Sequence, residues 1–372
     1  MRFLISILFF FFLSFQILSQ QSYRFKTEID IDATPVISQG RTGTCWSFST
    51  SSFLESEIIR LTGKQIDLSE MYTVRNTYLK KAENYIFRQG KAQFDEGGLA
   101  HDVINSVKEN GLVPIEVYTG LFKTRKRHNH AELVAVLKAM LNAYIKNPAG
   151  KLSPKWRDAV EALLDIYIGK KVDNFTYNGK KYTPKSFLKE TKINPDDYIT
   201  LTSYTHQPFY TSFILNIPDN WSNGSFYNLP LDEFINTIDS ALKKGYTVAL
   251  DCDVSERTFS SKDGVAVIPL EEGNLKALQG IYPEKTITQE YRQQEFENYN
   301  TTDDHLMHIT GIVSDQNGTK YYKVKNSWGT NPNRTNHNGY IYMSEAYVRL
   351  KAISILLHKD AVAEKILKQL GL

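Results

Sequence analysis

The stretch Gln39-Gly40-Arg41-Thr42-Gly43-Thr44-Cys45-Trp46-Ser47-Phe48 places a cysteine at the start of a predicted helix. Apolar residues at helical spacing, such as Leu54 and Ile58, continue the pattern over residues 44–61. A thiol at the first turn of a helix lies near the positive end of the helix dipole and near free backbone N–H groups. Both favour the thiolate, which is the nucleophilic form. The stretch therefore predicts that Cys45 is a nucleophile.

The residues before the cysteine are suited to hold a substrate carbonyl. Gly40 and Gly43 let the backbone approach a substrate closely. The side chain of Gln39 offers an amide donor, and the backbone N–H of Cys45 offers a second. Two such donors can stabilise the negative charge that develops on the carbonyl oxygen during attack. We therefore expect an oxyanion hole made by Gln39 and Cys45.

A predicted β-hairpin supplies the base that such a thiol needs. Residues 306–313 and 319–325 are rich in β-branched and aromatic residues, and the turn signal 315–318 separates them. His305 opens the first strand and Asn326 closes the second, so the hairpin brings them side by side. The imidazole can exchange a proton with Cys45 and with a leaving amine, while the asparagine carbonyl holds the ring.

Strand periodicity bears on which of two histidines has this role. If the hairpin loop has an even number of residues, Asn326 shares a face with residues 305, 307 and 309, and His308 points to the other face. An odd loop reverses this arrangement. We favour His305, and we expect His308 to be a packing residue.

The remaining pattern is helical first and extended last, which predicts the α+β class. Predicted helices cover residues 98–110, 131–146, 156–168, 231–243 and 361–370, and further strands cover residues 246–251, 340–343 and 352–358.

Three segments together resemble the papain superfamily of cysteine peptidases. Residues 34–36 and 39–48 resemble the entry to its active-site helix, and residues 325–329 resemble its Asn-Ser-Trp-Gly segment. His305 takes the position of the family's histidine, six residues before Gly311.

The resemblance implies a papain-like fold. A helical left half carries the cysteine on a central helix, and an antiparallel β-sheet right half carries the histidine and the asparagine. It also implies the site residues. These are the catalytic Cys45, His305 and Asn326, the oxyanion hole of Gln39 and Cys45, Trp328 as a shield of the His–Asn hydrogen bond, and Gly97 and Gly98 as partners of the substrate backbone.

Within the superfamily, the chain is most similar to bleomycin hydrolase and the bacterial aminopeptidase C group. Residues 95–98 have acidic residues before the two glycines, residues 305–307 resemble that group's His-Ala-Met, and residues 121–245 fit a helical insertion of its kind. In that group a C-terminal arm in the cleft restricts cleavage to the ends of peptides. Here residues 361–370 are followed only by Gly371-Leu372, so we expect no arm.

Composition excludes several other classes of protein. The chain has 372 residues, 41% of them hydrophobic, and a net charge of only +3, which does not indicate nucleic acid as a partner. The basic run at residues 123–130 lacks interleaved aromatic residues and is interpreted as a solvated segment.

Because Cys45 must be free, we expect no disulfide, and we expect Cys252 to be a small buried residue. No cofactor is predicted, and residues 251–253 and 303–304 lack a calcium-loop pattern, so no metal is predicted either.

The N-terminus predicts export. Met1-Arg2 is followed by an apolar run over residues 3–15, which is shorter than the ~20 residues that span a bilayer. We expect residues 1–20 to be a signal peptide and residues 21–372 to be the peptidase domain. The mature protein would then be periplasmic or secreted, with no stable membrane span.

The sequence thus predicts a thiol-dependent peptidase that forms an acyl-enzyme, an aminopeptidase or an oligopeptidase acting on peptides. Three alternatives stay open: an endopeptidase without N-terminal restriction, a peptide-binding protein that retains the cleft without turnover, and acyl transfer to an amine. A homo-oligomer is also compatible with the sequence.

Overall fold

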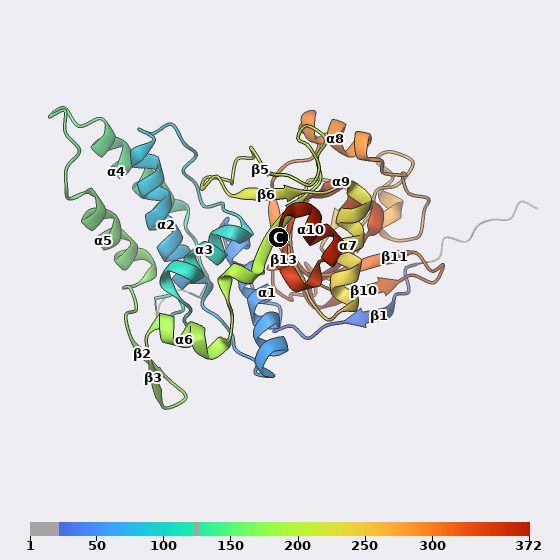
Figure 1. The fold of residues 1–372 in the computed structure, drawn as a ribbon, viewed down its shortest axis with the longest axis horizontal. Helices are drawn as coiled ribbons and strands as arrows, with labels where there is room; N and C mark the ends of the chain where they lie inside the picture. Colours follow the sequence, from blue (N-terminus) through green and yellow to red (C-terminus); the bar gives the residue numbers. More distant parts are fainter. Residues whose placement is uncertain (1–21, 123–125) are drawn as a thin grey trace, which may run out of the picture.

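The computed structural model describes residues 22–122 and 126–372, so the predicted signal peptide lies outside the described residues. Helices form one half of the molecule, on the left in Figure 1. They are α1 (Cys45–Thr62), α2 (Glu70–Phe87), α3 (Ala100–Asn110), α4 (Ala131–Ile145), α5 (Trp156–Ile168) and α6 (Pro184–Thr191).

An 11-stranded sheet forms the other half of the described chain, with strand order β5-β6-β4-β13-β7-β10-β11-β12-β9-β8 and with β1 paired to β10. The strands are β1 (Lys26–Asp30), β4 (Tyr198–Thr202), β5 (Ser212–Ile214), β6 (Ser225–Asn228), β7 (Val248–Cys252), β8 (Phe259–Ser260), β9 (Val265–Ala266), β10 (His305–Ser314), β11 (Lys320–Lys325), β12 (Tyr340–Ser344) and β13 (Ala352–His358). All pairs are antiparallel except β12–β9 and β4–β6. The predicted α+β class is confirmed.

Four more helices accompany the sheet in Figure 1: α7 (Leu231–Lys243), α8 (Gln289–Glu297), α9 (Glu345–Lys351) and α10 (Glu364–Leu370). A separate small hairpin joins β2 (Phe175–Tyr177) to β3 (Lys180–Tyr182). Among the described residues, no helix is both long enough and apolar enough to cross a membrane.

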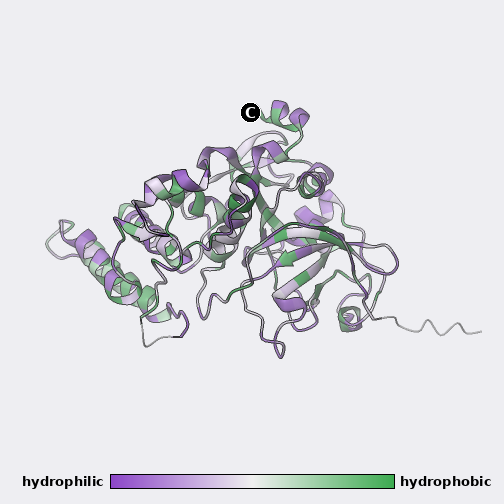
Figure 2. Cartoon of the chain, turned by 90° about the horizontal axis from the view of Figure 1, so that it is seen from below, coloured by the Kyte–Doolittle hydropathy of each residue, from purple (hydrophilic) through white to green (hydrophobic). Residues whose placement is uncertain are grey.

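Helix α1 is the member of the helical half that packs on the sheet, and its apolar side chains are enclosed. Phe53, Leu54 and Ile58 are fully buried, and the helix packs against α2, α3 and strand β10. Gly63 ends it in the left-handed conformation, with its N–H donated to the carbonyl of Ile59 at 2.8 Å. Apolar stretches along the strands, green in Figure 2, run through the interior of the sheet half. The central helix is therefore fixed on both sides by buried surface.

The predicted helical insertion over residues 121–245 is only partly helical. Its first part forms α4 and α5, which pack on α2, and then α6. Residues 198–228 instead supply β4, β5 and β6, and β4 pairs with β13 in the main sheet. The sequence of β4 alternates Thr with Tyr, Ile and Leu, a composition that suits a strand, and the prediction overlooked it.

The register of the β10–β11 hairpin puts Asn326 on the face of His305, although the loop is odd. Ser314 pairs with Lys320, which leaves an odd loop, residues 315–319. A register shift between Ile309 and Gly311 then adds one residue to β10, so that His308 lies opposite Lys325. The odd loop and the bulge offset each other, and Asn326 shares a face with residue 305 as expected.

The close contact of Gly311 with β1 allows a test of the pairing between β1 and β10. A Cβ atom at Gly311 would lie 2.1 Å from the carbonyl oxygen of Ile29 on β1. We expect Gly311→Ala to lower the free energy of unfolding by about 1–3 kcal/mol, because β1 must move away from β10. Urea denaturation measures this. The control Ser314→Ala removes one exposed hydrogen bond to Glu28 and should change stability by less than about 0.5 kcal/mol. Equal stability of the two variants would contradict the close pairing.

Candidate active site

The start of α1 meets the start of β10. Cys45 is the first residue of α1 and is buried, with 8% of its surface exposed. The backbone N–H groups of Leu306 and Trp46 donate to its sulfur. Because Leu306 follows His305 directly, the thiol and the imidazole belong to neighbouring positions, although 260 residues of sequence separate them.

The hydrogen bond between His305 and Asn326 fixes the ring. Nε2 of His305 lies 2.8 Å from Oδ1 of Asn326, and the same oxygen accepts the backbone N–H of Ser327 at 2.7 Å. A carbonyl acceptor requires a proton on Nε2, so Nδ1 is the basic nitrogen of the neutral ring. The ring of Trp328 covers the imidazole, with centroids 4.8 Å apart and 38% of the tryptophan exposed.

Burial acts on both reactive groups. It raises the pKa of the Cys45 thiol to about 12, and the charges of Asp219 and Asp251 act in the same direction. It lowers the pKa of His305 to about 4, against the effect of the hydrogen bond to Asn326. Either charge alone is therefore unfavourable here, whereas moving the proton from sulfur to imidazole creates two opposite charges together and leaves the net charge unchanged.

Gln39 is oriented by a residue that the sequence reasoning missed. Its Oε1 accepts the hydroxyl of Ser327 at 2.6 Å, and its Nε2 donates to the carbonyl of Thr42 at 2.6 Å. The backbone N–H of Gln39 also donates to the carbonyl of Ser327 at 2.9 Å. The second N–H of the Gln39 side-chain amide stays available to donate to a substrate oxygen. The signal was present, since Ser327 belongs to the Asn-Ser-Trp-Gly segment.

The two glycines predicted to bind substrate lie beside the start of α1. A Cβ at Gly98 would lie 3.2 Å from the ring of Trp46, so the glycine packs directly on that side chain. The Trp46 indole donates to the carbonyl of Glu96 at 3.0 Å, and the carboxylate of Glu96 accepts the N–H of Gly43. Gly97 faces a carboxylate from a distant segment, that of Asp219.

His308 lies away from this group, as expected. Its Nδ1 is 3.0 Å from the hydroxyl of Ser52, and Ser52 accepts a hydrogen bond from Lys325 at 2.7 Å. Burial, followed by the charge of Lys325, holds the pKa of His308 well below its usual value. The imidazole is therefore neutral and packs against α1.

A buried ionic network behind α1 was not predicted. The ammonium group of Lys325 donates to Thr34 at 2.9 Å, and Thr34 donates to the carboxyl of Glu55. Burial raises the pKa of Glu55 to about 8. The oxygens of Glu55, Asp67 and Glu70 lie within 4.8 Å of one another, a spacing that a metal ion could use. Burial raises the pKa of all three carboxyls, and the charge of Lys325 acts in the opposite direction on each of them.

Cys252 is buried as predicted and both cysteines are free. It lies on β7 opposite His305, and its thiol contacts the carbonyl of Asp253 at 3.4 Å. Burial raises its pKa well above the usual value, so this thiol is unreactive.

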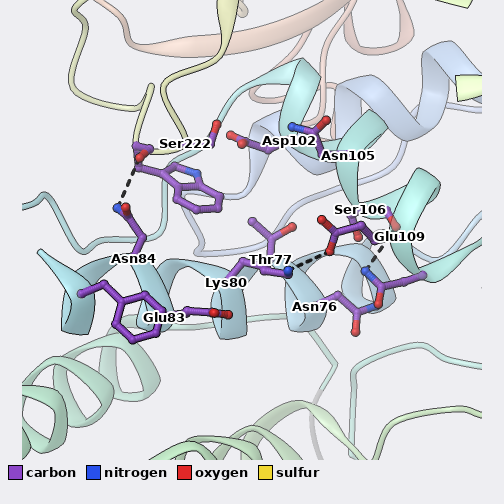
Figure 3. Close-up of a pocket in the computed structure, with 13 residues that line it drawn as sticks. Asn76, Thr77, Lys80, Glu83, Asn84, Asp102, Asn105, Ser106, Glu109 and Ser222 are labelled. Carbon is purple, nitrogen blue, oxygen red and sulfur yellow. Dashed lines mark hydrogen bonds and ion pairs between the residues drawn. The ribbon is translucent and has the colours of Figure 1, made fainter. Parts of the chain in front are cut away.

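A pocket outside the active site is drawn in Figure 3. It has a volume of about 470 Å³ and lies between α2 and α3, beside Trp221 and Ser222. Its other walls include the ion pair between Lys80 and Glu109, at 2.9 Å. None of the predicted site residues lines it.

Comparisons with known proteins identify the family of this chain. The profile of the Peptidase C1-like family matches residues 167–371, more than half of the chain, and that of the Papain family cysteine protease matches residues 22–149. Aminopeptidase G of Lactobacillus delbrueckii subsp. lactis is 24% identical over 90% of this chain and 83% of its own length. Aminopeptidase C of Listeria innocua serovar 6a is 25% identical over 91% and 83%.

Among solved structures, PepW from Lactobacillus rhamnosis HN001 has the same fold. The TM-score is 0.73 with 19% sequence identity, over 93% of this chain and 84% of that one. The resemblance to papain-like peptidases and to the aminopeptidase C group is thus confirmed. The chain belongs to the Peptidase C1-like family and is a papain-like cysteine peptidase.

Proposed function

We propose that the protein hydrolyses peptide bonds with Cys45 as nucleophile, His305 as base and acid, and Asn326 as the residue that orients the imidazole. The observation that carries the proposal is the 2.8 Å hydrogen bond between His305 and Asn326, next to a thiol that contacts Leu306. A carbonyl at Nε2 directs the basic Nδ1 to the remaining side of the ring, where a thiol can give up its proton.

The reaction begins when the Cys45 proton moves to Nδ1 of His305. The thiolate attacks the substrate carbonyl, and the oxygen gains negative charge as the carbon becomes tetrahedral. The backbone N–H of Cys45 and the available amide N–H of Gln39 donate to that oxygen. His305 then gives its proton to the leaving amine as the C–N bond breaks, which leaves an acyl-enzyme. A water molecule, deprotonated by His305, releases the acid and regenerates the thiol.

Peptides with a free N-terminus are the proposed substrates. Relatives that match along most of this chain are named aminopeptidase G and aminopeptidase C, which supports exopeptidase action.

Trp328 covers His305 and limits access of water to the His–Asn hydrogen bond, so this bond keeps its strength in the site.

The role of Cys45 is tested by replacement and by alkylation. Cys45→Ala should lower kcat/KM on peptides by at least about 1,000-fold, because the acyl-enzyme cannot form. Native protein treated with iodoacetamide at pH 7 should carry the label on Cys45 and not on Cys252, as peptide mass spectrometry will show. The control Cys252→Ala should keep its activity per folded molecule. Labelling of neither thiol until the protein unfolds would contradict a nucleophilic Cys45.

The choice between the two histidines is tested by a matched pair of variants. His305→Gln should lower kcat by about 10²- to 10⁴-fold, the usual contribution of a general acid–base group. His308→Gln, on the same strand and equally enclosed, should lower the melting temperature while keeping most activity per folded molecule. Initial rates normalised to folded protein by circular dichroism separate the two effects. The reverse ranking of rates would assign the base to His308.

We further propose that the protein is exported, on the pattern of residues 1–20. Expression of the full chain in a bacterial host should give a periplasmic or secreted product that lacks about these residues, with a mass that an intact-protein spectrum reports. A product that keeps Met1 and stays in the cytoplasm would contradict the proposal.

A further inference from the structure

The segment 217–224, between β5 and β6, bridges the two halves of the molecule. On the sheet side, the backbone N–H of Asp219 donates to the carboxylate of Asp303 at 3.1 Å. On the helical side, Asn84 of α2 donates to the carbonyl of Trp221 at 3.2 Å, a bond drawn in Figure 3. His101 of α3 contacts Ser222 at 2.9 Å. Bonds to both halves therefore hold this segment across the site.

Asp303 is itself held in place from the sheet. Its carboxyl shares a hydrogen bond with that of Asp251 on β7, and Asp251 accepts the hydroxyl of Ser354 at 3.3 Å. Burial, together with the charge of Asp303, raises the pKa of Asp251 well above its usual value, which favours a proton shared between the two carboxyls. Asp303 lies two residues before His305. The bridging segment is thus anchored directly to the strand that carries the imidazole.

The carboxylate of Asp219 lies directly over Gly97. A Cβ atom at Gly97 would be 2.0 Å from Oδ2 and 2.3 Å from Oδ1, so only glycine leaves room for this side chain. Oδ1 accepts a hydrogen bond from Gln93 at 3.1 Å. The charge of the buried Lys81 acts on Asp219 and opposes the rise in its pKa, while the carboxylates of Asp95 and Asp102 act in the opposite direction. The ammonium group of Lys81 donates to the carbonyls of Asp95 and Gly97.

The charge of Asp219 reaches the reactive thiol. The Asp219 carboxylate contacts Gly97, whose neighbour Gly98 packs on Trp46 directly after Cys45, and its charge is among those that raise the pKa of the Cys45 thiol. Its own pKa is raised by burial to about 6, so it is ionised at neutral pH. The carboxylate of Glu96 adds a second negative group on the same side of α1. Because Asp95, Asp102, Glu96 and Asp219 outnumber the single cation Lys81 here, this side of α1 favours a further cation.

We propose that Asp219 binds the free α-amino group of the substrate and confines cleavage to the N-terminal end of peptides. The inference rests on the function proposed for Cys45. Gly97 offers backbone and no side-chain pocket, so the group that meets Asp219 there is the backbone amine. A longer chain on this side would collide with the carboxylate and with the segment that carries it. One residue thus supplies both attraction for an ammonium group and a steric end to the cleft.

The test compares Asp219→Asn with the wild-type enzyme on aminoacyl arylamides that carry either a free or an acetylated α-amino group. For the free amine, the variant should lose about 10- to 100-fold in kcat/KM, the value of a charge-assisted hydrogen bond. The loss should appear in KM, with kcat little changed, because the contact exists before and during the reaction. Cleavage of the acetylated substrate should not fall. The control Asp95→Asn removes one exposed charge from the same region. It should change kcat/KM neither for the free amine nor for the acetylated substrate.

A second measurement, the rate at which Cys45 is alkylated, should rise in the variant while kcat/KM falls. Asp219→Asn should speed alkylation of Cys45 by iodoacetamide at neutral pH, because a negative charge that raises the pKa of the thiol is removed. A misfolded variant would instead lose selective labelling of Cys45 over Cys252. Slower cleavage of free-amine substrates together with faster alkylation of Cys45 is a combination that a merely structural role does not produce.

The outcomes separate the two proposals. If the wild-type enzyme cleaves peptides through Cys45 and Asp219→Asn leaves the preference for free over acetylated substrates unchanged, the assignment of Asp219 is overturned and the proposed function stands. A loss confined to substrates with a lysine side chain, whatever the state of the α-amino group, also overturns it. If Cys45→Ala still cleaves peptides, both proposals fall together.

Discussion

The first residue of α1 and the first residues of β10 must lie side by side, and the rest of the site depends on this contact. Neither half of the molecule contains both groups, since Cys45 belongs to the helical half and His305 to the sheet. The contact is held because α1 is enclosed by apolar side chains on one side and lies along β10 on the other. The reaction therefore uses a geometry that packing over the whole interface maintains.

Four consecutive residues, 325–328, fasten the two halves to each other at the site. Lys325 enters the buried network behind α1, and Asn326 holds the imidazole. Ser327 fixes the amide of Gln39, and Trp328 covers the ring of His305. In an extended strand end, alternate side chains point to opposite sides, so one short segment can reach the helix and the hairpin together. Asn326 and Ser327 are also linked directly, because the Asn326 carbonyl oxygen accepts the backbone N–H of Ser327.

Sequence reasoning located the residues that belong to short patterns and missed those that act at long range. Cys45, His305 and Asn326 stand in motifs or at strand ends, where local chemistry identifies them. The face of His305 depends on the loop parity, which the sequence left open, and on the bulge near residue 310, which Gly311 could have signalled. Asp219 could not be found this way. It stands in an irregular segment more than a hundred residues from Gly97, and only the folded chain brings the two together.

The shared proton between Cys45 and His305 is tested most directly by ¹⁵N NMR of the His305 imidazole at pH 7. Burial outweighs the hydrogen bond to Asn326 and lowers the pKa of this ring to about 4, so an imidazolium at neutral pH needs a stabilising negative charge such as the thiolate. Protonation of both ring nitrogens in the free enzyme, lost when the Cys45 sulfur is methylated, is the expected result. A neutral ring that is the same before and after methylation would contradict the ion pair.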